Sequence, residues 1–303
     1  MKENVEDLLT PNLWLALAAE MLGTMTITLL GCGSHATYQE NNFLHVALTF
    51  GLTVATVVWV FNHVSGGHMN PAVTLAALFT RRVSIIRGVL YIVFQIIGGI
   101  IGAGVLYGLS SSRHFPYLGS NELSLSTSSA EGFGVEFMIT LVYVLAYFAC
   151  HDDKRSDLRG SAPLTLGLAV VACHVFAIPF TKAGMNPARS FGPALISDSW
   201  RDHWVFWVGP LVGGLVAGLL YEYIFAAGAT FAGAKKCLLR TKKPRKQTEP
   251  EKAPLEEIKT DAIEVEDTKI DGEDAPEVVV DKTETAAEEK PGNGASADEV
   301  KKD

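Results

Sequence analysis

Long apolar stretches alternate with short polar ones along most of this 303-residue chain. The apolar stretches lie at about residues 12–34, 44–63, 87–108, 133–151, 161–180 and 204–226. A bilayer with a hydrocarbon core of roughly 30 Å is crossed by about 20 apolar residues in a helix, so each stretch is long enough to span it. Six such stretches favour an all-α membrane protein over a large soluble helical protein. The polar, acid-rich start of the chain does not have the pattern of a cleavable signal peptide.

Two short motifs repeat within this pattern, "HMNPAVT" at 68–74 and "GMNPARS" at 184–190, 116 residues apart. The same shift places Glu20 on Glu136 and "TFGLTV" on "TLGLAV". Several matches in the same order indicate a duplicated unit. Each unit holds three apolar stretches, an odd number, so the second copy enters the membrane from the opposite side. The sequence therefore predicts an inverted repeat, a class of fold whose sites lie near the midplane.

Each motif opens an apolar run that is too short to span, and we predict half-helices over 70–80 and 186–196. About ten residues at 1.5 Å each give roughly 15 Å, which is half of the bilayer. Asn is a favoured N-cap and Pro a favoured first helical residue, so Asn-Pro-Ala is a compact helix start. The two half-helices should enter from opposite faces and meet in the middle. The backbone before them is tolerated there only if it lines a water-filled cavity.

Charge is distributed unevenly along the chain. The sequence has 33 acidic and 25 basic residues, a formal net charge of −8, and residues 241–303 hold 19 of the acidic and 11 of the basic ones. This acidic, aromatic-poor tail is expected to be disordered. Its basic "KKPRK" start is expected to lie against anionic lipid head groups. Lys and Arg in the loops after the second, fourth and sixth stretches predict that both termini are cytoplasmic.

The sequence offers little chemistry for an enzyme or a metal site. Its four cysteines have no metal-ligand spacing, although Cys237, beside two lysines, is a candidate for palmitoylation. No nucleophile stands in a recognisable arrangement with Glu20, Glu136, His63 and His68. We therefore expect no enzyme activity, no cofactor, no metal and no nucleic-acid partner.

The paired motifs and the repeat resemble the aquaporin, or major intrinsic protein, family over about residues 10–228. The strings that resemble its orthodox water-selective animal branch are "SGGHMNPAVT" (65–74), "GSAPLTLGL" (160–168), "NPARSFGPA" (186–194) and "HWVFWVGP" (203–210). The resemblance implies six transmembrane helices plus two re-entrant half-helices, with water passing in single file. It also implies a homotetramer in the cell membrane, surrounded by lipid.

The resemblance implies a division of the chain into five parts. These are a cytoplasmic N-terminus (1–11), a first repeat (12–116), an extracellular connecting loop (117–132), a second repeat (133–228) and a cytoplasmic tail (229–303). The partner of the tail is unknown.

The same resemblance implies roles for particular residues. The pore motifs are Asn70, Pro71, Ala72, Asn186, Pro187 and Ala188, with each Asn amide offered to passing water. An outer constriction is implied at Phe50, His174, Ala183 and Arg189. Glu20 and Glu136 are implied to lie buried and to hold the re-entrant loops by hydrogen bonds. Plainer alternatives remain, namely Phe50 in the core, His174 as an interior histidine and Arg189 as an outer-loop charge.

Selectivity for water is expected because glycerol-conducting relatives have a small residue where His174 stands and Asp directly after the Arg, where this chain has Ser190. Two alternatives stay open. One is a channel of the same fold that also passes glycerol or other small neutral solutes, and the other is a non-conducting structural or adhesion homologue. In addition, "RRVS" at 81–84 marks Ser84 as a possible phosphorylation site.

The constriction predicts a response to mercurials. Many mercurial-sensitive members of the family have Cys where Ala183 stands, so we expect no block at that position. Cys173, beside His174, is the alternative target. Osmotic water flux with and without a mercurial, in the unaltered protein and in Cys173→Ser, tests this. A block that persists in Cys173→Ser would contradict the expectation.

Overall fold

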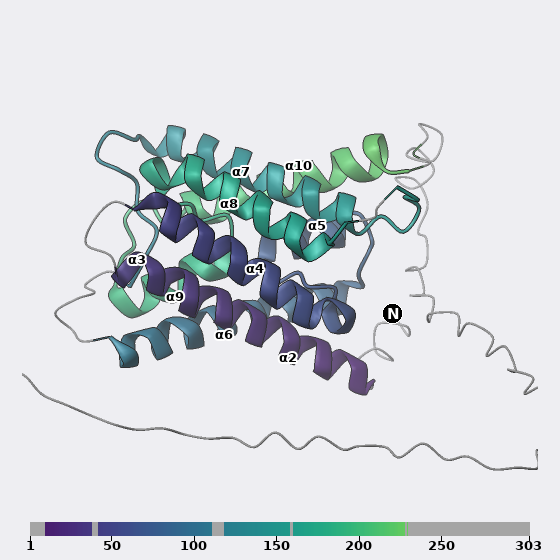
Figure 1. Cartoon of the computed structure of the whole chain (residues 1–303), viewed down its shortest axis with the longest axis horizontal. Coiled ribbons are helices and arrows are strands. Elements are labelled where there is room, and N and C mark those ends of the chain that lie inside the picture. The colour runs from purple at the N-terminus through teal and green to yellow at the C-terminus, as the bar shows by residue number, and fades with distance from the viewer. Residues whose placement is uncertain (1–9, 38–41, 111–117, 158–159, 228, 230–303) are drawn as a thin grey trace, which may run out of the picture. The chain divides into compact units, whose positions relative to one another are not determined.

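The computed structural model describes residues 10–37, 42–110, 118–157, 160–227 and 229, and the structural statements below concern these residues. The tail segments at 235–246 and beyond, including Cys237 and "KKPRK", lie outside them. The described elements are helical throughout (Figure 1). They are α2 (Pro11–Thr26), η1 (Ile27–Cys32), α3 (Gly33–Thr37), α4 (Phe43–Ser65), α5 (Pro71–Phe79), α6 (Ile85–Leu109), α7 (Ser129–Cys150), α8 (Ala162–Thr181), α9 (Pro187–Ser197), α10 (Val205–Leu220) and η2 (Tyr221–Phe225).

Six helical segments within the described residues are long and apolar enough to cross a membrane. They are Pro11–His35, Phe43–Ser65, Ile85–Leu109, Ser129–Cys150, Ala162–Thr181 and Val205–Phe225. The first comprises α2, the π-helical η1 and α3, and the last comprises α10 and the π-helical η2. The two remaining helices, α5 and α9, have 9 and 11 residues, which is about half of a span. The prediction of an all-α membrane protein with six spans and two half-helices is confirmed.

The helices pair in a way that repeats between the two halves of the chain. α2 packs on α6, as α7 packs on α10, and α4 packs on α8 at the centre. The half-helices are exchanged, because α5 of the first half lies against α10 while α9 of the second half lies against α6. Figure 1 shows the start of α2 and the end of α10 at the same end of the bundle, with α3 at the other. Each half-helix is therefore held in part by the opposite repeat.

Two glycines allow this exchange. A Cβ atom added to Gly99 of α6 would lie 2.3 Å from the carbonyl oxygen of Ala188, and one added to Gly214 of α10 would lie 2.9 Å from that of Ala72. Such distances leave no room for a side chain, so glycine lets the spanning helices touch the starts of the half-helices. The glycine-rich stretches of α6 and α10 thus serve close packing within the chain.

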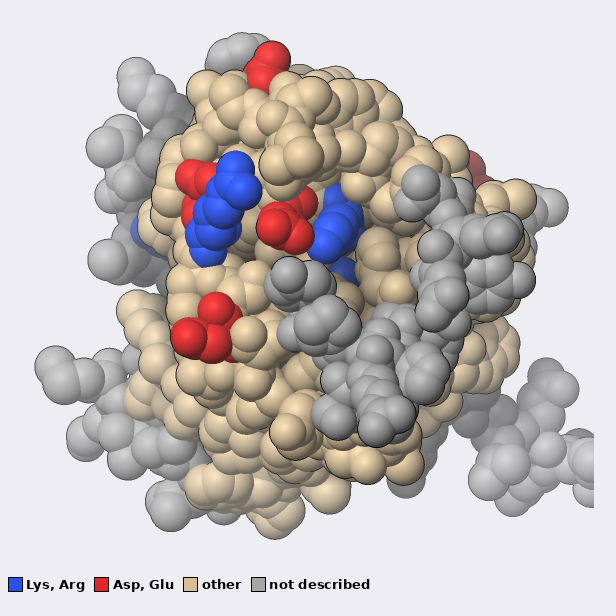
Figure 2. Space-filling model, turned by 90° about the vertical axis from the view of Figure 1, so that its left-hand side faces the viewer, with Lys and Arg blue, Asp and Glu red and all other residues tan. Residues whose placement is uncertain are grey.

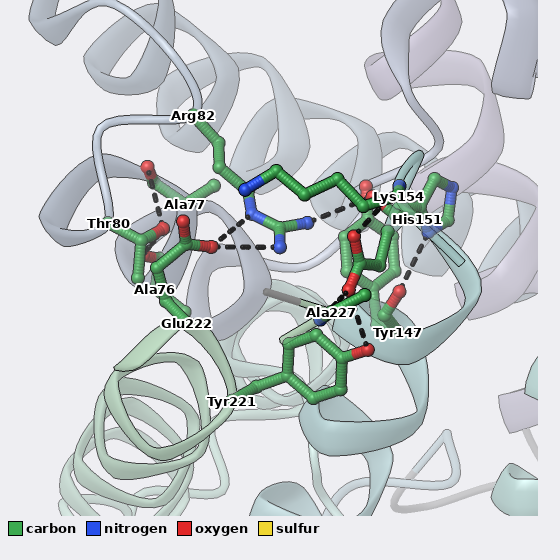
Figure 3. Close-up of polar contacts among 11 residues, drawn as sticks. Ala76, Ala77, Thr80, Arg82, Tyr147, His151, Lys154, Tyr221, Glu222 and Ala227 are labelled. Atoms are coloured by element: carbon green, nitrogen blue, oxygen red, sulfur yellow. Dashed lines mark hydrogen bonds and ion pairs between the residues drawn. The ribbon is translucent and has the colours of Figure 1, made fainter. Parts of the chain in front are cut away.

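A polar cluster ties the end of α5 to the ends of α7 and α10 (Figure 3). Arg82 donates from Nε and Nη2 to Glu222 Oε2 at 3.1 and 2.9 Å, and from Nη1 to the His151 carbonyl at 3.1 Å. Its guanidinium also lies 4.2 Å from the centre of the Phe148 ring. One side chain therefore joins three segments that are far apart in sequence.

Asp152 completes the cluster by binding the chain where it leaves α10. Its Oδ2 accepts from the Ala227 N–H at 2.8 Å and from the Tyr221 hydroxyl at 3.2 Å, and its Oδ1 accepts from the Lys154 N–H at 3.1 Å. Burial by itself raises the pKa of Asp152, but these hydrogen bonds, with the nearby Arg82 charge, hold that pKa below its ordinary value. The carboxylate is therefore charged at neutral pH.

We expect Arg82→Met to destabilise the folded chain, because the change leaves the half-buried Glu222 carboxylate without its charged donors. The loss should be about 1–3 kcal/mol, and each kcal/mol lowers the unfolding midpoint by about 2–4 °C in a chain of this size. Thermal unfolding of the purified protein measures it. Arg201→Met is the matched control, since Arg201 is 63% exposed and 3.7 Å from Asp202. Equal midpoints for the two variants would contradict the expectation.

Candidate functional site

The starts of the two half-helices are built in the same way. Asn70 is the N-cap of α5, and its Oδ1 accepts from the Ala72 N–H at 2.8 Å. Asn186 is the N-cap of α9, and its Oδ1 accepts from the N–H groups of Ala188 and Arg189 at 3.0 and 3.3 Å. Each asparagine therefore satisfies N–H donors that a helix start otherwise leaves without a partner.

The two asparagines also connect the half-helices to each other. Asn70 Nδ2 donates to the carbonyl of Met185 at 2.9 Å, and Asn186 Nδ2 donates to the carbonyl of Met69 at 2.7 Å. Met69 and Met185 have left-handed φ angles of 44° and 56°. Such backbone costs about 1–3 kcal/mol per residue and needs support from its surroundings. The half-helices thus meet at their N-terminal ends, with the positive ends of both dipoles at the same place.

Glu20 holds the segment before α5. Its Oε1 accepts from the Ser65 hydroxyl at 2.6 Å and from the His68 N–H at 3.0 Å, and its Oε2 accepts from the Met69 N–H and from Gln95 Nε2. The carboxylate is fully buried. Gln95 was given no role by sequence reasoning. In the sequence it is marked only by being a polar residue within an apolar stretch.

Glu136 holds the segment before α9 in the same manner. Its Oε1 accepts from the Thr181 hydroxyl at 2.6 Å and from the Gly184 N–H at 2.8 Å, and its Oε2 accepts from the Met185 N–H at 2.8 Å. Each of these partners lies 116 residues after its counterpart at Glu20. The repeat is therefore expressed as two matching hydrogen-bonded clusters, each of which satisfies irregular backbone at membrane depth.

A narrow cavity of about 30 Å³ passes the ends of both half-helices. It is lined by backbone and side chains of both repeats, among them Phe50, His68, Asn70, His174, Asn186 and Arg189. A cavity needs about 10–15 Å³ of such space to hold one water, so this one has room for only a few water molecules. The described residues contain no cluster of three or more His, Cys, Asp and Glu side chains that would suit a metal ion.

Three of the residues implied to form the outer constriction lie together. The ring centres of Phe50 and His174 are 4.5 Å apart, and the Arg189 guanidinium lies 4.9 Å from the Phe50 ring centre. His174 Nδ1 lies 3.0 Å from the Val170 carbonyl, so this nitrogen carries the proton and Nε2 is an acceptor in the neutral ring. Buried His174 Nε2, Arg189 Nε and Arg189 Nη2 have no hydrogen-bond partner among the described residues. The two residues that carry these atoms both line the cavity.

Arg189 is oriented by a residue that the sequence did not single out. Its Nη1 donates to Asn121 Oδ1 at 2.7 Å and to the Gly119 carbonyl at 3.0 Å. Asn121 also accepts from the Ser190 hydroxyl at 2.8 Å and donates to the Thr181 carbonyl at 3.0 Å. It is a loop residue without periodic neighbours, so no sequence pattern identified it.

The other residues named from the sequence lie as follows. Pro71 and Pro187 are the first residues of α5 and α9. Ala183 is fully buried, with a left-handed φ of 53°, and its neighbour Gly184 lines the cavity. Ser84 is the N-cap of α6, where its hydroxyl accepts from the Arg87 N–H at 3.2 Å. It is not among the residues that line the cavity.

Comparison with known proteins places these features in a family. A family model described as "Major intrinsic protein" matches residues 7–221. Aquaporin-4 of Mus musculus is 45% identical over 222 residues, which are 71% of this chain and 69% of the relative. Aquaporin-1 of Canis lupus familiaris is 41% identical over 226 residues, covering 70% and 83%. The lens fiber major intrinsic protein of Gallus gallus is 41% identical over 263 residues, covering 86% and 100%.

A solved structure has the same fold. The X-ray structure of the aquaglyceroporin from Plasmodium falciparum matches with a TM-score of 0.64 and 22% identity, over 70% of this chain and 96% of that one. At this identity the likeness concerns the fold alone. The matched family model and the exchanged half-helices agree with this fold. The chain belongs to the major intrinsic protein, or aquaporin, family.

Proposed function

We propose that the chain is a passive water channel, in which an osmotic gradient drives water in single file through the cavity between the half-helices. The observation that carries the proposal is the lining of the narrow cavity. Phe50 contributes an apolar surface to it, while His174, Arg189, Asn70 and Asn186 contribute a few isolated polar atoms. The named relatives Aquaporin-4 and Aquaporin-1 support the same function.

Water passes because the lining replaces the hydrogen bonds that it gives up on entering. His174 Nε2 serves as an acceptor, while Arg189 Nε and Nη2 serve as donors. At the centre, each asparagine amide has two N–H groups and uses one on the opposite methionine carbonyl, which leaves the other for water. An unmade hydrogen bond costs about 1–3 kcal/mol, so these few groups keep the barrier for water low.

Cations and protons are excluded by charge and by desolvation. Arg189 contributes a buried positive charge at the constriction, and the two helix N-termini contribute positive potential at the centre. A cation in this space also loses its hydration, which costs several kcal/mol or more at membrane depth. In aquaporin-type pores generally, such electrostatic barriers act together with pore diameter and lining polarity.

Glycerol conduction is the second candidate, because a solved structure with this fold is that of an aquaglyceroporin. A polyol needs both greater width and an apolar wall. The small cavity, of about 30 Å³, and the bulk that the contacting rings of Phe50 and His174 add to its lining argue for water instead. A non-conducting structural homologue is the third candidate, and the unpartnered polar atoms of the lining argue against it, since a closed core would satisfy them.

The surroundings of the channel complete the proposal. The chain is a multi-pass membrane protein, and we place it in the cell membrane with both termini cytoplasmic and with the α3 end outside. Large apolar side chains on the spans are exposed, including Trp59 at 70% and Leu52 at 57%, and they suit lipid or further copies in a homotetramer. Ser84, beside two arginines, remains a proposed phosphorylation site.

Purified protein in liposomes tests the function directly. After a hyperosmotic step, the proteoliposomes should shrink much faster than empty liposomes, as followed by light scattering, while glycerol uptake and proton leak stay at the level of empty liposomes. Rapid glycerol uptake would favour the second candidate. Water flux no faster than that of empty liposomes would contradict the proposal.

His174→Ala tests what restricts the pore. Removing the ring widens the constriction and leaves Arg189 facing apolar wall, so glycerol flux should rise by about tenfold or more, equivalent to at least about 1.4 kcal/mol off its barrier. Water flux should change much less. His63→Ala, on an exposed position of α4, is the control and should leave both fluxes unchanged. An unaltered ratio of glycerol to water flux in His174→Ala would show that this ring does not set selectivity.

A further inference from the structure

The cavity has a second layer of lining residues, one helical turn beyond the constriction as seen from the α3 end. Cys173 Sγ donates to the Ile139 carbonyl at 3.5 Å, so α8 next to His174 is level with α7 at Ile139. Because consecutive spans run in opposite directions, Tyr143, four residues further along α7, is level with Val170, four residues before His174. At 1.5 Å per residue, this layer lies about 6 Å beyond the His174 ring.

The neighbours of Tyr143 in this layer are aliphatic. Val54, one turn beyond Phe50 on α4, and Val170 of α8 both line the cavity. Charged side chains lie elsewhere. Figure 2 shows basic and acidic groups beside one another at the surface of the α3 end, and Arg189, at the constriction, is the only Lys, Arg, Asp or Glu among the described residues that line the cavity. Water that enters the second layer therefore meets aliphatic surface from α4 and α8 and gives up hydrogen bonds there.

The hydroxyl of Tyr143 is a polar group of this layer that the fold itself does not use. Among the described residues, no hydrogen bond joins it to another group. Some unpartnered polar atoms, such as Thr140 Oγ1, are completely enclosed by protein, but the Tyr143 hydroxyl is not one of them and so keeps some exposed surface. Since the Tyr143 side chain is only 5% exposed and lines the cavity, that surface faces the cavity.

Two nearby tyrosines show what a structural hydroxyl does in this molecule. Tyr147, one turn further along the same face of α7, donates to the Gly66 carbonyl at 2.6 Å, and Tyr91 donates to the Ser65 carbonyl at 2.9 Å. Both hydroxyls hold the irregular backbone before α5. The hydroxyl of Tyr143 holds no other described group, and a water molecule in the cavity would satisfy it.

We propose that Tyr143 is a second selectivity residue of the pore, which contacts the permeating molecule one helical turn beyond the constriction. Its hydroxyl donates to and accepts from passing water where the neighbouring wall is aliphatic, and its ring fills space that a wider solute would need. Exclusion of larger solutes is thus divided between two layers, one with the ring of His174 and one with the ring of Tyr143. This inference deepens the proposed function and rests on it.

The hydroxyl is tested by Tyr143→Phe, which keeps the ring. In proteoliposomes, the osmotic water flux per channel should fall by about two- to tenfold, the contribution of one hydrogen bond to the barrier, while glycerol stays excluded. The unfolding midpoint should not fall, because the hydroxyl has no partner among the described residues. Tyr107→Phe, the same exchange at a 59% exposed position of α6, is the control and should change neither quantity.

Tyr147→Phe separates this role from a structural one. It should lower the unfolding midpoint, since the Gly66 carbonyl loses its donor. A fall in the midpoint of Tyr143→Phe as large as that of Tyr147→Phe would overturn the assignment of the Tyr143 hydroxyl to the permeant. Unchanged or faster water flux in Tyr143→Phe would overturn it as well.

The ring is tested in the His174→Ala background, where the first layer no longer limits glycerol. Adding Tyr143→Leu should raise glycerol flux by about fivefold or more over His174→Ala alone, because crowding of the wider solute is relieved, whereas adding Tyr143→Phe should not. Equal glycerol flux with and without Tyr143→Leu would overturn the role of the ring. Absence of water flux in the unaltered protein would instead contradict the proposed function, so the two failures are distinguishable.

Discussion

Backbone that is not helical cannot be left in a membrane without hydrogen-bond partners, and this constraint governs the centre of the molecule. The segments before α5 and α9 are irregular and include left-handed methionines. Glu20 and Glu136 meet the constraint, since each buried carboxylate accepts two backbone N–H groups and a hydroxyl. The carbonyls of Met69 and Met185 in the same segments accept from the asparagine of the opposite half-helix.

The inverted repeat follows from the same requirement. A half-helix alone would end at mid-membrane with unpaired donors, and the Asn cap satisfies only part of them. The second copy supports each helix start in another way, because each Asn amide donates to the carbonyl of the opposite methionine and each half-helix packs on a span of the other repeat. The constriction departs from the symmetry, since the 116-residue shift places His174 and Arg189 on Val58 and Val73.

Much of this arrangement could be predicted from the sequence, because it depends on local or repeated signals. Asn70 and Asn186 were found by their motifs, and Glu20 and Glu136 by their equal spacing. Asn121 could not be predicted, since it acts through contacts with residues distant in sequence and lies in a loop where no periodicity marks a buried face. Gln95 was visible as a polar residue in an apolar span, but only the fold brings it to Glu20.

The role of the buried carboxylates is tested most directly by Glu136→Gln, compared with Glu131→Gln, where an exposed capping-box glutamate is exchanged for a residue that caps equally well. Glutamine keeps only one acceptor oxygen. Its amide N–H groups would face the backbone N–H groups of Gly184 and Met185, which precede α9. The account predicts that Glu136→Gln lowers both the unfolding midpoint and the water flux per folded molecule, while Glu131→Gln changes neither. Unchanged water flux and stability in Glu136→Gln would contradict it.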